Sequence, residues 1–209
     1  MRAYAPPTTK ITDASVIGCG AAAGQLYSSS EPFPSGTELC QDRIRSLISR
    51  GATPSTGVVV WLSNWERSDQ VVNGRLVRFR TRAGHRLVMR QIERVRRDVR
   101  ERTSAPIVML TVAAPSTADA EDGTRPGERS DDSRYAQLNR MLRKFAARHP
   151  DDVKVIAFAK KVCPTGPPCG DAGGFNPRGG DGRHLTTEGS VWAARWLYPK
   201  LAQLAPSSP

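Results

Sequence analysis

The stretch GVVVWL at residues 57–62 is a short, continuous apolar run in which valine predominates. Such runs are typical of strands that are buried on both faces of a parallel sheet. Two further runs have the same character, PIVMLTVA at residues 106–113 and VKVIAF at residues 153–158. Helical periodicity fills the intervals between the runs, so the pattern predicts strands that alternate with helices.

The predicted helices follow from the spacing of their apolar residues. They cover residues 37–51, 85–102 and 133–150, and a last helix runs from Thr186, a suitable N-cap, to about Leu204. A fourth strand is predicted near the amino end, in KITDASVIGCG at residues 10–20. This order predicts an α/β fold in three layers, α/β/α, around a mainly parallel sheet. We expect one domain over residues 1–209, with a disordered tail at residues 205–209.

The composition is that of a globular domain with a strongly basic charge. The 209 residues carry 31 lysines and arginines against 20 aspartates and glutamates, a formal net charge of +11. The densest basic run, residues 90–102, contains acids and lacks the aromatic residues that stack on nucleic-acid bases, so nucleic acid is not the expected partner. A solvated Arg-rich surface explains the charge, and attraction to an anionic polymer is the alternative. Neither a membrane-spanning run nor a signal peptide is visible in the sequence.

Four cysteines occur, Cys19, Cys40, Cys163 and Cys169. Cys163 and Cys169 enclose PTGPP, a turn-rich stretch that can bring them together, which leaves Cys19 for Cys40. Four buried free thiols are the alternative. Because the chain has no CxxC pair and only 3 histidines, a zinc site is not expected. Two disulfides would indicate an oxidising compartment.

The candidate functional residues lie in segments that follow the strands, because ligands of parallel sheets bind beyond the carboxyl ends of the strands. The most informative segment begins at Asp181, which stands three residues before His184. A carboxylate at this spacing can accept a hydrogen bond from the imidazole and stabilise the imidazolium during proton transfer. An aspartate that caps the last helix beside an incidental histidine is the alternative.

Four stretches in this order resemble the SGNH (GDSL-type) hydrolases. They are DASVIGCG at residues 13–20, VVVWLSNWERSD at residues 58–69, VCPTGPPCG at residues 162–170 and DGRHLTTEGSVWAARWLYPKL at residues 181–201. More narrowly, the chain resembles the extracytoplasmic SGNH domain at the carboxyl end of membrane O-acyltransferases of the acyltransferase-3 type. The resemblance implies a flavodoxin-like form of the α/β/α fold, a serine nucleophile, and no cofactor or metal.

The resemblance also implies roles for particular residues. Asp181 and His184 match the acid and base of the last family block, and Gly18 matches the glycine whose N–H lines the oxyanion hole. The third block departs from the family pattern GxND: Asn64 comes one position early and Trp65 takes its place. Both remain candidate donors, and one lost donor in such a hole can lower the rate by roughly 10²–10³.

The first family block, Gly-Asp-Ser, is absent from the 209 residues. In the family its strand precedes the Gly18 strand by one crossover of roughly 30 or more residues, whereas 17 residues precede Gly18 here. We therefore expect an N-terminally truncated domain that lacks its first strand and is inactive as given. Ser15 is a weaker alternative, because it lies within the predicted strand and not on a strand-to-helix turn.

The function implied by the resemblance is that of an esterase or O-acyltransferase acting on acyl esters of cell-envelope glycans or glycolipids. Its partners would be an acylated saccharide or glycolipid substrate and a membrane acyltransferase domain in the same or another chain. The implied location is extracytoplasmic, with a membrane tether in the full-length form. A catalytically inactive binding or docking module is the alternative, favoured by the missing serine.

A few other residues have a packing interpretation beside a functional one. Trp192, Trp196 and Tyr198 are expected to pack the last helix against the sheet rather than to stack on a ligand. Glu66 and Asp69 are expected to be solvated loop acids, with a position at the mouth of a pocket as the alternative. Phe175 either lines a cleft or belongs to a plain loop.

Overall fold

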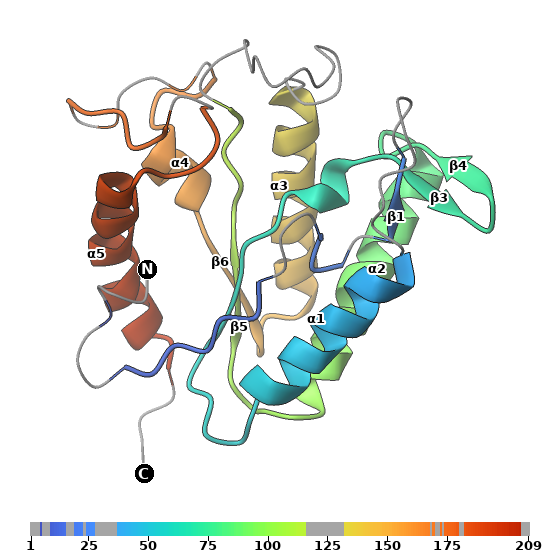
Figure 1. The fold of residues 1–209 in the computed structure, drawn as a ribbon, viewed down its shortest axis with the longest axis horizontal. Coiled ribbons are helices and arrows are strands. Elements are labelled where there is room, and N and C mark those ends of the chain that lie inside the picture. Colours follow the sequence, from blue (N-terminus) through green and yellow to red (C-terminus); the bar gives the residue numbers. More distant parts are fainter. Residues whose placement is uncertain are drawn as a thin grey trace.

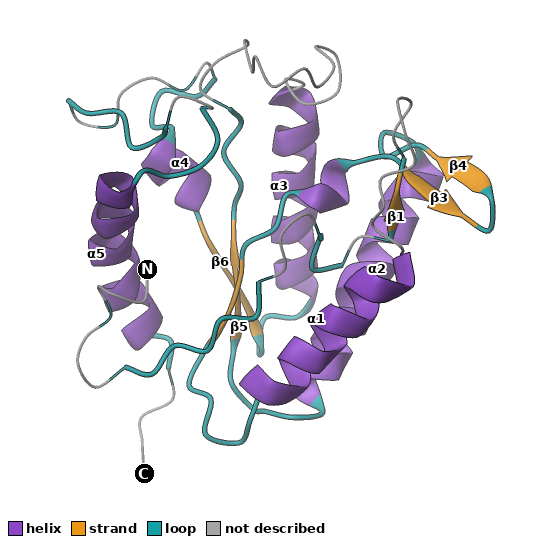
Figure 2. Cartoon of the chain, viewed as in Figure 1, coloured by secondary structure: helices purple, strands orange, loops and turns teal. Residues whose placement is uncertain are grey.

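The structure, a computed structural model, describes residues 5, 9–15, 19–22, 24–27, 37–115, 132–167, 169, 172, 174–179 and 182–205. Its helices are α1 (Thr37–Gly51), α2 (Arg82–Arg100), α3 (Asp132–Arg148), α4 (Phe158–Val162) and α5 (Thr187–Ala202), with a 3₁₀ turn η2 (Trp65–Arg67). Its strands are β1 (Gln25–Leu26), β2 (Val59–Trp61), β3 (Gln70–Val72), β4 (Arg75–Val77), β5 (Ile107–Leu110) and β6 (Val153–Ile156). Figures 1 and 2 show their arrangement.

The three apolar runs form one parallel sheet. Its strand order is β2-β5-β6, with Val59 opposite Ile107 and Ile107 opposite Val153. β5 lies between the other two strands, and all four of its residues are buried. The prediction of an α/β fold around a parallel sheet is therefore confirmed.

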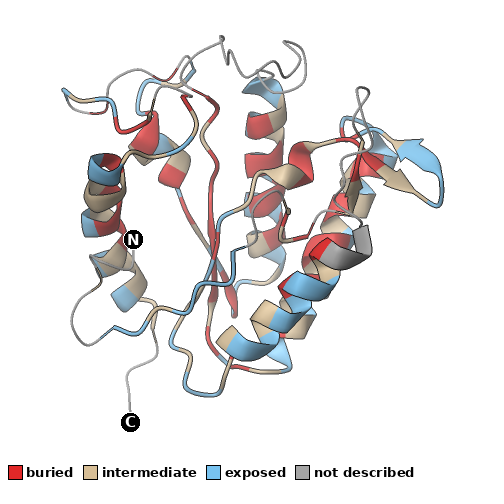
Figure 3. Cartoon of the chain, viewed as in Figure 1, coloured by how far each residue is buried: buried red, intermediate tan, exposed pale blue. Residues whose placement is uncertain are grey.

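Alternate residues of β5 face two separate hydrophobic clusters. Ile107 and Met109 pack with residues of α2 and α3, whereas Val108 and Leu110 pack with residues of α4 and α5. Figure 1 shows α5 on one side of the sheet and α1, α2 and α3 on the other, and Figure 3 shows the buried positions concentrated in β5 and on the inner helix faces. Trp192 and Trp196 pack against the second cluster, as predicted.

β2 corrects the prediction that residues 57–62 are buried on both faces. Val60 is 42% exposed and Leu62 is 47% exposed. Within the described residues β2 pairs with β5 alone, and the cluster under α5 includes residues of β5 and β6 but neither Val60 nor Leu62. An apolar run shows that a segment favours a strand, but it does not show whether a helix covers both faces of that strand.

Residues 63–74, the segment in which Glu66 and Asp69 were expected to be loop acids, contain secondary structure. After η2 the chain forms the hairpin β3–β4, and β1 pairs with β3 to complete a small antiparallel sheet. Asn73 has φ 51° and Gly74 has φ 72°, the left-handed conformations that a two-residue hairpin turn requires. The Asn-Gly dipeptide between two β-prone triplets was the sequence signal for this hairpin.

The amino-terminal strand predicted at residues 10–20 is not formed in its described part. Residues 10–15, 19 and 20 have no strand conformation, and the Ser15 N–H donates to the Asp13 carboxylate at 2.9 Å, a local turn that competes with strand pairing. Residues 16–18 of this segment lie outside the described residues. So do residues 116–131 and most of the predicted tail.

Candidate active site

His184 lies at the carboxyl edge of the parallel sheet, in the segment that leads into α5. The segment is fixed by an isolated bridge between Arg178 and Leu185, and the Gly179 N–H donates to the His184 carbonyl at 2.9 Å. Thr186 then caps α5, because its hydroxyl accepts from the Gly189 N–H at 2.9 Å. The predicted N-cap is confirmed, and the His184 side chain is exposed to solvent.

Gly189 shows how closely α5 packs on the segment before His184. A β-carbon at this position would lie 1.9 Å from the Pro177 carbonyl oxygen. Only glycine permits this approach, and the Thr186 N–H donates to the same carbonyl at 3.0 Å. The position of His184 therefore depends on a rigid contact between the loop and the first turn of α5.

Arg178 ties the His184 segment to the end of β5. Its side chain is buried, and one guanidinium nitrogen donates to the carbonyls of Ala114 and, at 2.9 Å, Gly182. Ala114 lies in the segment that follows β5, so this arginine joins two segments at the same edge of the sheet. The sequence analysis did not identify Arg178, because a single arginine in a glycine-rich stretch is typical of a solvent-exposed loop.

Asp181 and Gly18 lie outside the described residues, so the structure does not place them relative to His184. Asn64 and Trp65 follow β2 at the same edge of the sheet. Asn64 precedes η2 with φ −122° and ψ −5°, and its side chain does not cap this turn. Its amide is therefore not committed to the turn.

Glu66 and Ser63 hold together the two segments that were expected to supply the oxyanion hole. The Glu66 carboxylate is 1% exposed; one oxygen accepts from the Ala22 N–H at 2.8 Å and the other from the Ser63 hydroxyl at 2.7 Å. The Ser63 oxygen in turn accepts from the Ala21 N–H at 3.3 Å. We refer to these contacts as the Ser63–Glu66 clamp. It fixes the backbone after residue 18 against the turn after β2.

The prediction that Glu66 and Asp69 are solvated loop acids is wrong for both residues. Asp69 is also buried, and one of its carboxylate oxygens accepts from the Phe79 N–H at 2.8 Å and from Arg134 at 2.9 Å. A buried carboxylate is stable where hydrogen-bond donors bind its oxygens. These donors come from segments distant in the sequence, which a local pattern cannot reveal.

Arg67 is a buried cation in the same turn. Its side chain is packed on Tyr135 of α3, with the guanidinium carbon 4.4 Å from the ring centroid. Burial lowers the pKa of the Arg67 guanidinium below its ordinary value; Tyr135 acts in the opposite direction, and the positive charges of Arg134 and Arg183 lower the pKa further. The cation thus lies in a poorly solvated environment.

Both predicted disulfides are confirmed. Cys19 is bonded to Cys40 of α1, and Cys163 is bonded to Cys169, with Cα–Cα distances of 5.6 and 4.9 Å. The first disulfide ties the segment after residue 18 to α1, and the second closes the turn after α4. Two disulfides indicate an oxidising, extracytoplasmic environment. In the described part of the chain, no helix is both long and apolar enough to cross a bilayer.

Phe175 contacts α5. Its ring lies edge-on to Trp192, with centroids 5.5 Å apart, and Lys161 of α4 lies over the same indole at 4.0 Å from the ring centre. Aromatic and cation–π contacts of this kind hold the segment before His184 against α4 and α5.

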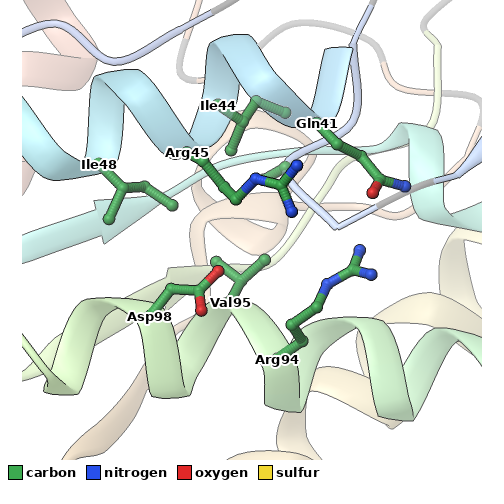
Figure 4. Close-up of a pocket in the computed structure, with 8 residues that line it drawn as sticks. Gln41, Ile44, Arg45, Ile48, Arg94, Val95 and Asp98 are labelled. Atoms are coloured by element: carbon green, nitrogen blue, oxygen red, sulfur yellow. The ribbon is translucent and has the colours of Figure 1, made fainter. Parts of the chain in front are cut away.

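A shallow hollow lies between α1 and α2. Gln41, Ile44, Arg45, Ile48, Ala21, Arg94, Val95 and Asp98 line it, and Figure 4 shows their side chains between the two helices. None of the candidate catalytic residues contributes to it. Among the residues that the structure describes, no group of three or more His, Cys, Asp or Glu side chains gathers in a way that could hold a metal ion.

No protein-family model matches the chain, and no curated protein matches it. The functional interpretation therefore depends on the residues of the site themselves.

Proposed function

We propose that the chain belongs to an SGNH-type acyl-ester hydrolase or O-acyltransferase domain that acts on acylated saccharides or glycolipids of the cell envelope. The observation that carries the proposal is the position of His184, exposed at the carboxyl edge of the parallel sheet and fixed by the bridge to Arg178 and the capped start of α5. This edge is where parallel sheets bind ligands. The proposed finer fold is the three-layer, flavodoxin-like sandwich of these enzymes, without its first strand.

In the proposed reaction His184 acts as the general base and then as the general acid. It takes the proton of a serine hydroxyl while the serine oxygen bonds to the acyl carbon, and it returns that proton to the departing alcohol as the ester bond breaks. Water or a sugar hydroxyl then attacks the acyl-serine and gives its proton to His184, which returns that proton to the serine oxygen as the acyl–serine bond breaks. Asp181 holds the tautomer of His184 and stabilises the imidazolium. No cofactor is needed.

The oxyanion of the tetrahedral intermediate would be stabilised by the Gly18 N–H and the side-chain amide of Asn64. Asn64 is preferred to Trp65 as the second donor, because its amide does not cap η2. The Ser63–Glu66 clamp supports this role, because it fixes both segments against one another through buried hydrogen bonds. Preorganised donors of this kind contribute much of the catalysis in acyl transfer.

Among the described residues one edge of β2 is unpaired, and this supports a strand–helix unit as the source of the serine. An unpaired strand edge favours pairing with another strand, and Val60 and Leu62 beside it are exposed apolar residues. Both alternate with Trp61, which packs in the cluster under α2 and α3, so both face the α5 side of the sheet. A strand would pair with the edge of β2, and a helix after it would cover Val60 and Leu62.

The amino-terminal segment flanks this free edge in the direction of a parallel strand. Thr12 lies beside Gly51, at the end of α1 and before β2, where a β-carbon on Gly51 would be 3.3 Å from the threonine methyl. Ala21 bonds to Ser63, after β2. Thr12 thus lies near the amino end of β2 and Ala21 near its carboxyl end, yet no described residue of this segment forms a strand with β2.

The right-handedness of crossovers predicts that the proposed helix would cover the face of the sheet on which Val60 and Leu62 are exposed. The connections from β2 to β5 and from β5 to β6 run through α2 and α3 on one face. The proposed strand would lie beside β2, and its connection would lead outward to the amino-terminal segment. This connection would cross the sheet in the direction opposite to those from β2 to β5 and from β5 to β6. A right-handed crossover in that direction places its helix on the other face, where Val60 and Leu62 are exposed.

The test is ester hydrolysis by the full-length gene product, with 4-nitrophenyl acetate as substrate. We expect hydrolysis that His184→Ala lowers by about 10³-fold and that Asn64→Ala lowers by roughly 10²-fold. His149→Ala is the matched control, because His149 ends α3 at the opposite edge of the sheet and should leave the rate unchanged. Hydrolysis that survives His184→Ala, or none from the intact wild-type protein, would overturn the proposal and favour a binding module.

A further inference from the structure

The hairpin β3–β4 and the first half of α2 form a basic surface. Residues 70–92 contain arginines but neither aspartate nor glutamate. Five of these arginines are exposed, and none of the five forms an ion pair in the described part of the chain. They are Arg75, Arg78, Arg82, Arg86 and Arg90. We refer to these five side chains, together with Leu76, as the hairpin–helix surface.

The second half of α2 provides an internal comparison, because its arginines are compensated. Arg96 lies 3.1 Å from the Glu93 carboxylate and 2.9 Å from the Asp152 carboxylate. In the first half, by contrast, three exposed arginines follow one another at intervals of four residues. This spacing places them on one face of the helix, where like charges repel and destabilise it. An anionic partner would remove this repulsion.

The hairpin adds an exposed apolar pair to the surface. Val71 of β3 lies directly opposite Leu76 of β4, so both side chains point to the same face of the hairpin. Gln70, the neighbour of Val71, is buried, and its amide is paired with that of Gln91 of α2. Because neighbouring side chains alternate between faces, Val71 and Leu76 face away from α2. Leu76 is 40% exposed, and Figures 1 and 3 show the hairpin at the periphery of the molecule.

We propose that the hairpin–helix surface docks on an anionic lipid surface. Each arginine held near such a surface strengthens binding by about fivefold. Leu76 would enter the interface while the neighbouring arginines stay among the lipid phosphates. This exposed leucine favours lipid over a soluble anionic polymer, because a hydrated polymer offers no apolar phase in which to bury it. The inference does not depend on the proposed function.

The test is cosedimentation of the 209-residue chain with vesicles of phosphatidylcholine that contain about 30% phosphatidylglycerol. We expect half of the protein to be bound at about 0.1 mM lipid in about 0.1 M salt, and weaker binding as added salt screens the charges. Vesicles of phosphatidylcholine alone should bind the chain far more weakly. Replacing both Arg82 and Arg86 by glutamine should weaken binding to the anionic vesicles by about 25-fold.

The matched control replaces both Arg143 and Arg148 by glutamine. This pair removes the same charge from exposed positions in the second half of α3, and it should leave binding nearly unchanged. Leu76→Ser should weaken binding to the vesicles by about fourfold and leave binding to soluble polyglutamate unchanged. All these positions are exposed, so thermal unfolding should give each variant the Tm of the wild type.

The proposal is overturned if the chain does not bind the anionic vesicles at up to about 5 mM lipid. It is also overturned if the two arginine pairs weaken binding equally, because net charge alone would then account for it. Vesicle binding that does not need Leu76, with tighter binding to polyglutamate, would assign the surface to an acidic polymer and contradict the proposal. Because the measurement does not involve catalysis, lipid binding and esterase activity can fail independently.

Discussion

The Ser63 hydroxyl donates a 2.7 Å hydrogen bond to the buried Glu66 carboxylate, and the same two side chains accept from the Ala21 and Ala22 amides. This clamp joins the segment after residue 18 to the turn after β2. It is the main polar connection between the amino-terminal segment and the parallel sheet in the part of the chain described. Its role can be measured independently of any catalytic activity.

Glu66→Ala should lower the free energy of unfolding by about 2–3 kcal/mol, because it leaves a buried amide and a partly buried hydroxyl without their acceptor. Ser63→Ala should lower it by about 1 kcal/mol. Urea unfolding with the disulfides intact measures both values. The control is Glu101→Ala, whose carboxylate is exposed and whose effect should stay within about 0.5 kcal/mol. An equally small effect of Glu66→Ala would contradict the clamp.

Replacing both Val60 and Leu62 by lysine should leave the stability of the isolated 209-residue chain within about 1 kcal/mol of the wild type, because both side chains are substantially exposed. The double variant should also bind less of a hydrophobic dye and associate less with itself. Val108→Lys is the control, because Val108 is fully buried in β5 and its replacement should prevent folding. Loss of folding in the Val60 and Leu62 variant would show that the chain itself covers this face.

The two disulfides should differ in how much they stabilise the fold and in how much they order the segment that leads to His184. Removing Cys19–Cys40, which closes the longer loop, should lower the free energy of unfolding by about 3 kcal/mol, against about 2 kcal/mol for Cys163–Cys169. Paired serine variants in a denaturant titration give these values. Removing Cys163–Cys169 should instead accelerate amide hydrogen exchange in residues 172–185, because this bond closes the turn that leads to His184. Equal exchange in both variants would contradict this division.

Alkaline pH should destabilise the protein through Tyr198. Burial raises the pKa of its phenol above the ordinary value. The native state therefore holds this proton at a pH where the unfolded chain has lost it, so the free energy of unfolding falls as pH rises above about 10. Below that pH the ionisation of Tyr198 does not contribute to the pH dependence of stability. Thermal unfolding of Tyr198→Phe should show a shallower alkaline decrease, and an unchanged decrease would assign the effect to other groups.

The sequence predicted the fold well where one local pattern determines one element. The valine-rich run before Ser63 and the run that forms β5 could only be strands, and Thr186 could be recognised as a helix cap from its residue type and position. The exposure of Val60 could not be predicted in this way. It depends on whether a helix from elsewhere covers that face of the sheet, and no local pattern contains this information.

The candidate site was predicted only in part, for the same reason. Position before α5 identified His184, but the burial of Glu66 and Arg67 depends on partners such as Ala22 and Tyr135, which lie 44 and 68 residues away in the sequence. From the local sequence alone, a charged residue in a polar segment is expected to be exposed to solvent. Its burial can be recognised only when such partners are known. The hairpin after Arg67 was also missed, although its Asn-Gly turn was visible in the sequence.

The most direct test of the account is to label the full-length gene product with a fluorophosphonate and to identify the modified residue by mass spectrometry. The account predicts a single labelled serine outside residues 1–209, in a Gly-Asp-Ser sequence after an apolar strand, and no labelling in His184→Ala. Labelling of Ser15, labelling that does not need His184, or no labelling of the intact protein would each contradict it.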